Sequence, residues 1–244
     1  MSRRAERAVA RASIAVVGVL IALSLLAGSL SPDSTLGRLA LGVRAFTLGT
    51  AVVITVALAV GLPFGIVAAT GPRSADGALA AVCDLCGVLP AVFVLTVAKF
   101  TAPGLLGILC VAGAARGIGF AWMLRGELTR AFAEEGDAVL RNLGHGPLLV
   151  LFRERIPRAL GPVLTAASLS GAWLVAVEAV AARIGLGPLT SHASFGAAFG
   201  RGEYGPAAAL AVALGTGALY VLARSASIRL GQGNESEPFA LVRK

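Results

Sequence analysis

Six stretches of the chain run for about twenty residues with almost no charged side chain, and this pattern constrains the fold more than any other feature. A helix rises about 1.5 Å per residue, so roughly 20 residues cross the hydrocarbon core of a bilayer, which is about 30 Å thick. We therefore predict an all-α membrane protein with six transmembrane helices. The predicted spans are residues 12–30, 46–69, 79–98, 105–124, 163–182 and 206–222.

Composition excludes the soluble alternatives. The chain is 57% hydrophobic and 14% charged, which is too few charges to cover the surface of a soluble domain of 244 residues. This excludes a soluble enzyme, a disordered chain and a secreted disulfide scaffold. The first apolar run, 12–30, is longer than the apolar region of a typical signal peptide, although its small residues could mimic a cleavage site. We interpret it as a retained membrane anchor.

The distribution of Arg and Lys sets the predicted orientation. With the N-terminus inside, fifteen basic residues fall on the cytoplasmic side and five outside, while Arg116 lies within a span. This positive-inside bias places both termini of a multi-pass membrane protein in the cytoplasm. The net charge of +8 is thus explained by anionic membrane lipid, with no need for nucleic acid.

The predicted organisation has three parts: a basic N-terminus (1–11), a six-span domain (12–230) and a polar C-terminal tail (231–244). The longest connection, 125–162, is cytoplasmic and rich in charge, and a loop of that kind is usually functional. Residues 137–143 have amphipathic helical spacing, Gly144 to Pro147 break that helix, and a second short helix is expected over 148–155, ending at the membrane at Pro157.

This loop resembles the EAA loop of bacterial ABC-importer permeases, specifically the class that serves dipeptides, oligopeptides and nickel. Its matching positions are Arg141, Leu143, Gly144, Arg153, Ile156-Pro157, Ala159-Leu160 and Pro162. Further matches, in the family's order, are Leu36-Gly37-Arg38, Gly42-Val43-Arg44, Asp76, Leu79, Asp84, Pro90, Arg125, Glu178 and Gly185-Leu186-Gly187. The family's loop Glu falls on Ala138, with Asp137 one place early.

The resemblance implies a type I ABC-importer permease fold and a multisubunit complex. The partners would be a second homologous permease subunit, two cytoplasmic ABC ATPase subunits and an extracytoplasmic substrate-binding protein, with membrane lipid around them. The residues implied to couple the permease to the ATPase are Asp137, Leu140, Arg141, Leu143, Gly144, Arg153 and Pro157. No enzymatic role, cofactor or metal is expected of this chain itself, which has no P-loop motif.

Charged residues inside the apolar runs leave alternatives open. Asp84 and Glu178 are candidates for the wall of a translocation pathway, or for structural pairing with Arg116 or Arg183. Arg116 is also interpreted as a side chain that extends toward the cytoplasmic membrane surface. A stand-alone secondary transporter or channel would use Asp84, Glu178 and Arg116 as an ion relay, and a membrane scaffold that does not transport is a third possibility.

Two smaller patterns have structural interpretations. The Cys83-x-x-Cys86 pair lies in an apolar run with no histidine near it, so helix packing is favoured over metal binding. The spacings Gly61-x-x-x-Gly65 and Gly113-x-x-x-Gly117 are typical of close helix–helix packing.

One prediction follows from the loop. Gly144→Pro should abolish substrate uptake by whole cells while leaving membrane insertion intact, because proline would redirect the turn between the two short helices. Normal uptake by this variant would contradict a coupling role for the loop.

Overall fold

The computed structural model describes residues 3–31, 34–88, 96, 100, 105–133, 146–183, 194–202 and 206–232. Within these residues every regular element is helical, which confirms the expected all-α class for the part described. The elements, in chain order, are α1 (Arg3–Leu26), α2 (Thr35–Thr70), α3 (Arg73–Val88), α5 (Leu105–Ala133), α7 (Pro147–Val150), η1 (Leu151–Arg155), α8 (Ile156–Ser168), α9 (Ser170–Arg183), α10 (Phe195–Arg201) and α11 (Pro206–Gln232).

Among the described residues, four helical segments are long and apolar enough to cross a membrane: α2, α5, the nearly continuous pair α8–α9, and α11. They contain the second, fourth, fifth and sixth predicted spans. α1 contains a shorter apolar stretch, Arg11–Leu26. The third predicted span, 79–98, is described as a helix as far as Val88, and residues 89–95 and 97–99 lie outside the described residues. The six-span topology therefore stays a prediction.

The helices extend beyond the apolar runs that predicted them. α5 continues to Ala133 and α11 to Gln232, because the Arg, Glu, Leu and Ala residues of these extensions are good helix formers. α2 begins at Thr35, well before its apolar run, because the Ser34 hydroxyl caps it by accepting a 2.9 Å hydrogen bond from the Gly37 N–H. Much of the expected loop before the second span is therefore helix.

The contact between α2 and α5 forms the centre of the bundle. A Cβ on Gly61 would lie 2.7 Å from the carbonyl oxygen of Gly117, and a Cβ on Gly117 would lie 2.7 Å from the carbonyl oxygen of Ala57. The two backbones can approach this closely because glycine has no side chain there. The packing role predicted from the paired glycine spacings is confirmed. Phe120, Leu124 and Leu128 continue the same core along α5.

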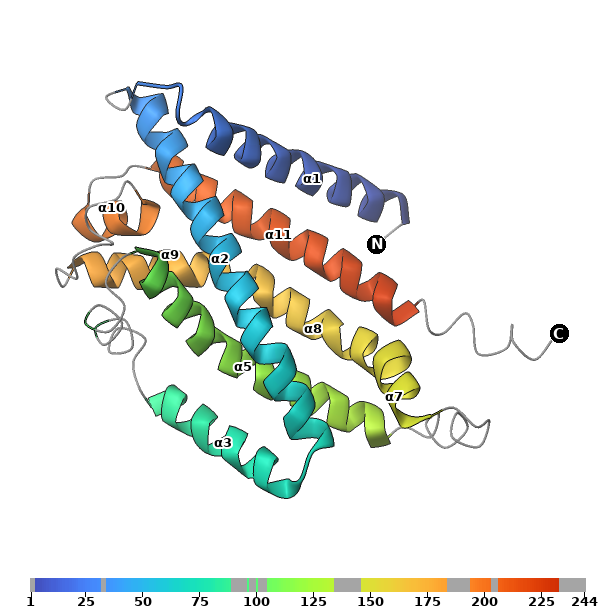
Figure 1. Ribbon diagram of the computed structural model, residues 1–244. Coiled ribbons are helices and arrows are strands. Elements are labelled where there is room, and N and C mark those ends of the chain that lie inside the picture. Colours follow the sequence, from blue (N-terminus) through green and yellow to red (C-terminus); the bar gives the residue numbers. More distant parts are fainter. Residues whose placement is uncertain are drawn as a thin grey trace.

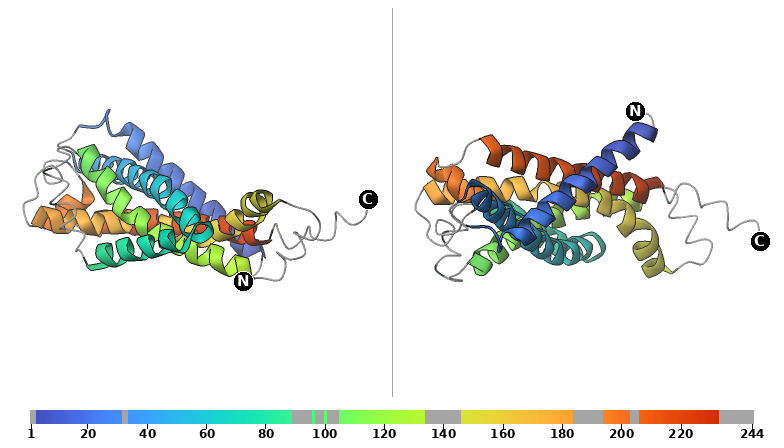
Figure 2. Two further views of the ribbon diagram at one scale, coloured as in Figure 1. Left: turned by 60° about the horizontal axis from the view of Figure 1, so that its bottom comes forward. Right: turned by 90° about the horizontal axis from the view of Figure 1, so that it is seen from above.

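The remaining helices surround this pair (Figure 1). α1 and α11 lie side by side along one edge of the bundle, and α3 lies along α5 at the opposite edge. In Figures 1 and 2 the starts of α1, α3 and α7 and the ends of α2, α5 and α11 all lie toward one end, whereas α10 lies at the other. This end-to-end alternation is what successive membrane crossings require.

Large apolar side chains are exposed along the outside of the long helices. Those with more than half of their surface exposed include Ile14, Leu25, Leu48, Phe64 and Leu210. A water-soluble monomer rarely exposes so much apolar surface, whereas lipid covers it at no cost. The exposure supports a membrane-embedded bundle.

The α2–α5 contact gives a direct test of the fold. Gly117→Leu should lower the melting temperature of the detergent-purified protein by roughly 5–10 °C, because the added side chain must displace the α2 backbone. The matched control is Gly119→Leu on the same helix, since a Cβ on Gly119 meets nothing within 4 Å. Equal melting temperatures for the two variants would contradict this packing.

Candidate functional site at the charged end of the helix bundle

Figure 1 shows the end of the bundle where α5 and α11 finish and α3 and α7 begin, and the sequence places several arginines in these helix ends. We call this the charged end and define it by Arg73, Arg125, Arg130, Arg153, Arg155, Arg158 and Arg224. All seven belong to the set predicted to face the cytoplasm. The part of the 125–162 segment that the structure describes also lies here.

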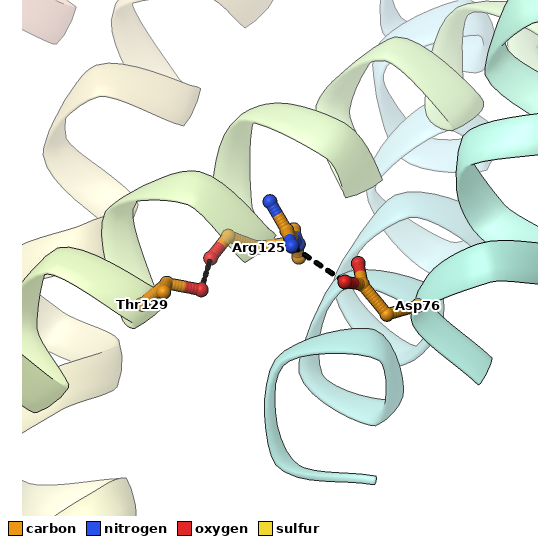
Figure 3. Close-up of polar contacts among 3 residues, drawn as sticks. All are labelled: Asp76, Arg125 and Thr129. Carbon is orange, nitrogen blue, oxygen red and sulfur yellow. Dashed lines mark hydrogen bonds and ion pairs between the residues drawn. The ribbon is translucent and has the colours of Figure 1, made fainter. Parts of the chain in front are cut away.

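An ion pair joins α3 to α5 at the charged end (Figure 3). Arg125 Nη2 donates to Asp76 Oδ2 across 2.6 Å, and the side chains are 28% and 36% exposed. The Arg125 guanidinium also lies over the Trp122 ring, 5.1 Å from its centroid. Asp76 sits in the first turn of α3, where a carboxylate is also favoured by the helix dipole. At this exposure the ion pair contributes about 1 kcal/mol, enough to set how α3 lies on α5.

The described part of the 125–162 segment is helical and packs on α5. α7, η1 and α8 follow one another without a break from Pro147 to Ser168. Leu151 is 7% exposed and packs in the same core as Leu124 and Leu128 of α5. The helix expected over 148–155 is confirmed, but it does not stop at Pro157. The chain continues as α8, and the π-helical turn Leu151–Arg155 shifts the backbone hydrogen-bond register directly before this proline.

The outer face of the helical arm, which we define as Pro147 to Arg155, is apolar. Leu149 and Phe152, three residues apart, are 47% and 62% exposed, and Arg153 beside them is also exposed. The turn Leu151–Arg155 is π-helical, a local distortion that often marks functional positions. An apolar pair exposed on one helix face indicates a surface that a partner protein or the membrane interface covers.

The predicted coupling residues divide into two groups. Arg153 lies exposed on η1, and Pro157 lies half-buried in the first turn of α8. Asp137, Leu140, Arg141, Leu143 and Gly144 lie outside the described residues. The sequence analysis did not single out Leu149 or Phe152; their spacing of three on a charged segment was the available signal.

The two carboxylates proposed for the pathway have different surroundings. Asp84 is exposed on α3. Glu178 on α9 is 6% exposed, and its carboxylate accepts hydrogen bonds from the Ser194 hydroxyl and the Gly196 N–H at the start of α10. Arg183 donates a 3.5 Å hydrogen bond to the Gly200 carbonyl. Neither of the two ion pairs among the described residues involves Glu178. A role of Asp84 and Glu178 in the wall of a pathway stays a prediction.

Arg116 lies in the middle of α5, between two aromatic rings. Its guanidinium carbon is 5.5 Å from the Phe120 ring centroid and 5.6 Å from that of Trp173 on α9. The side chain thus reaches only one helical turn, and the interpretation that it extends to the membrane surface is wrong. Phe120 is four residues along the same helix, whereas nothing local in the sequence signals Trp173.

Among the described residues, no group of three or more His, Cys, Asp or Glu side chains is placed to hold a metal ion. Cys83 Sγ instead donates to the Ile118 carbonyl across 3.7 Å, a contact between α3 and α5. His145 and His192 lie outside the described residues.

Comparison with known families gives one match. A family model described as "Binding-protein-dependent transport system inner membrane component" matches residues 61–228, more than half of the chain. The matched region contains α5, the helical arm and the α8–α9 pair. No curated protein matches the chain.

The ion pair generates a prediction that a double-mutant cycle tests. Asp76→Asn and Arg125→Gln should each lower the melting temperature, and the double variant should lose less than the sum, with a coupling of about 1 kcal/mol. The matched control is Glu127 with Arg130 on the same helix, a 3.5 Å pair whose Arg side chain is 79% exposed. Strict additivity at Asp76 and Arg125 would contradict the contact.

Proposed function

This chain belongs to the family of binding-protein-dependent transport system inner membrane components and is therefore a permease subunit of an ABC transporter, and we propose that it forms half of the translocation pathway of an importer for peptides or nickel-type small substrates. The proposed substrate class rests on the resemblance of the 125–162 loop to that of peptide and nickel permeases, and on the matching positions Asp76 and Arg125. The family carries with it ATPase and binding-protein partners. We propose the composition as one second permease subunit, two cytoplasmic ATPase subunits and one extracytoplasmic binding protein.

The observation that carries the coupling proposal is the helical arm from Pro147 to Arg155. It is fixed to α5 through Leu151 on one face and exposes Leu149 and Phe152 on the other. A rigid helix transmits a displacement that a flexible loop would absorb, and an apolar helix face fits a groove on a partner. We propose that this arm and residues 137–145 together dock on the ATPase, which moves α5 and α8 when it closes.

The topology belongs to the same proposal. Six membrane crossings with both termini in the cytoplasm would put the charged end at the ATPase side and the α10 end at the side of the binding protein. The gathering of basic residues at one end supports this orientation. The bacterial inner membrane is the proposed location.

A stand-alone transporter with an ion relay has less support. A relay needs Asp84, Glu178 and Arg116 within proton- or ion-transfer reach of one another. Glu178 is instead hydrogen-bonded to the start of α10, and Arg116 lies against two rings. Asp84 and Glu178 stay candidates for the pathway wall of the ABC permease.

The deciding experiment is a mild-detergent pull-down of the tagged chain with mass spectrometry of its partners. In one variant residues 137–145 are replaced by a Gly/Ser linker of equal length, which leaves the packed arm from Pro147 onward intact. In the control the same number of tail residues, 235–243, is replaced. We expect P-loop ATPases and a second permease with the native chain and the control, and loss of the ATPases alone from the linker variant.

A narrower variant tests the arm itself. Leu149→Ser with Phe152→Ser should weaken ATPase recovery by about tenfold or more, because two apolar anchors are lost from a small interface, while the second permease is still recovered. Recovery of the chain alone from native membranes, unaffected by either change, would favour the stand-alone transporter.

A further inference from the structure

The Arg116 guanidinium cannot reach hydrogen-bond acceptors at the membrane surface. Within the predicted span 105–124 Arg116 lies eleven residues from one end and eight from the other, which is about 16 Å and 12 Å along the axis. Both distances exceed the length of an arginine side chain. An ionised group at this depth is costly, and such residues in membrane proteins normally face a polar cavity or a partner rather than lipid.

The side chain is held, but not neutralised, by the part of the chain that the structure describes. The Phe120 and Trp173 rings fix the guanidinium through cation–π contacts. Its Nε is buried without a hydrogen-bond partner, and none of the hydrogen bonds or ion pairs among the described residues involves Arg116. The described residues therefore leave the donors of this planar group available to another acceptor.

The neighbouring surface is open. Gly119 lies three residues along α5, on the adjoining part of the helix face, and a Cβ there would meet nothing within 4 Å. A cation whose edge faced lipid would have no acceptor at this depth, whereas a translocation pathway brings polar solutes past it. The open side of α5 next to Arg116 thus fits the pathway wall.

We propose that Arg116, held by Phe120 and Trp173, binds the carboxylate of a small solute as it crosses the membrane, so that the transported substrate is a peptide-type acid rather than a metal cation. This rests on the proposed importer function and narrows its substrate class. A guanidinium edge offers two parallel N–H donors to one carboxylate, the geometry that arginine favours. A free divalent cation would be repelled by the same charge, the more so where water is scarce.

The first test measures binding by the complete complex in nanodiscs. The probes are alanyl-alanine and alanyl-alanine amide, which differ in the C-terminal carboxylate. The complex carries Trp122→Phe, which leaves Trp173 as the remaining tryptophan of this chain and a reporter beside Arg116. An otherwise identical complex that also carries Trp173→Phe serves as the blank for tryptophans in the partners.

We expect a fluorescence change with alanyl-alanine that Arg116→Gln weakens by about tenfold in Kd, since a charge-assisted bond is lost. The amide should bind the two complexes within about twofold of each other. Arg116→Lys should fall between them, because it keeps the charge but loses the two-pronged geometry. Arg130→Gln, which removes an exposed charge from the same helix, is the matched control and should bind as the native complex does. Equal binding of acid and amide, or no effect of Arg116→Gln, would overturn the proposal.

Uptake separates this proposal from the importer function. Cells with the native complex are given alanyl-alanine, its amide and nickel chloride together, and depletion of each is measured. Loss of alanyl-alanine uptake in Arg116→Gln, with the subunits still assembled, supports the site. ATP-dependent uptake of nickel by the native complex, or uptake of alanyl-alanine that Arg116→Gln leaves unchanged, keeps the importer function and overturns the carboxylate site. Loss of the second permease subunit from Arg116→Gln pull-downs would assign the guanidinium to a subunit contact and also overturn it.

Discussion

The backbone contact between α2 and α5 determines how the other features of the chain are presented. Lipid gives helices no hydrophobic reason to associate, so they are held by close packing, and glycine pairs such as Gly61 with Gly117 permit it. This contact fixes the rotation of α5 about its axis. Because Arg116, Trp122 and Arg125 lie on other sides of α5, the same contact sets the direction in which each of them points.

α5 thereby connects the middle of the membrane to the charged end. Arg116 lies near its midpoint, Arg125 holds α3 through Asp76, and Leu128 packs with Leu151 of the helical arm. A force on that arm acts on α5 and α8 through the apolar core that the three segments share. This core resists deformation because protein interiors are close-packed. The chain thus has a continuous path of rigid elements from the surface proposed to meet the ATPase to the residue proposed to meet the solute.

Local patterns predicted the helices, whereas contacts between distant segments decided the rest. Apolar length was enough for α2, α5 and α11. Glycine spacing predicted that α2 and α5 pack closely against other helices, but not that they pack against each other. Helix ends were missed, because polar helix formers extend α5 and α11 beyond the apolar run. The Trp173 ring over Arg116 and the bonds from α10 to Glu178 could not be predicted, since each joins segments with no local signal.

Glu178 and Arg116 are two charged residues of one membrane domain, and their different surroundings give them different roles. Ser194 and Gly196 satisfy the Glu178 carboxylate from within the chain, and Ser194 also caps α10 by accepting from the Ala197 N–H at 3.0 Å. The carboxylate oxygens therefore accept hydrogen bonds that hold α10 against α9. Arg116 has rings in place of acceptors, so it keeps its donors. A group that its own chain satisfies stabilises the fold, and a group that the described residues leave without an acceptor is the one available to a solute.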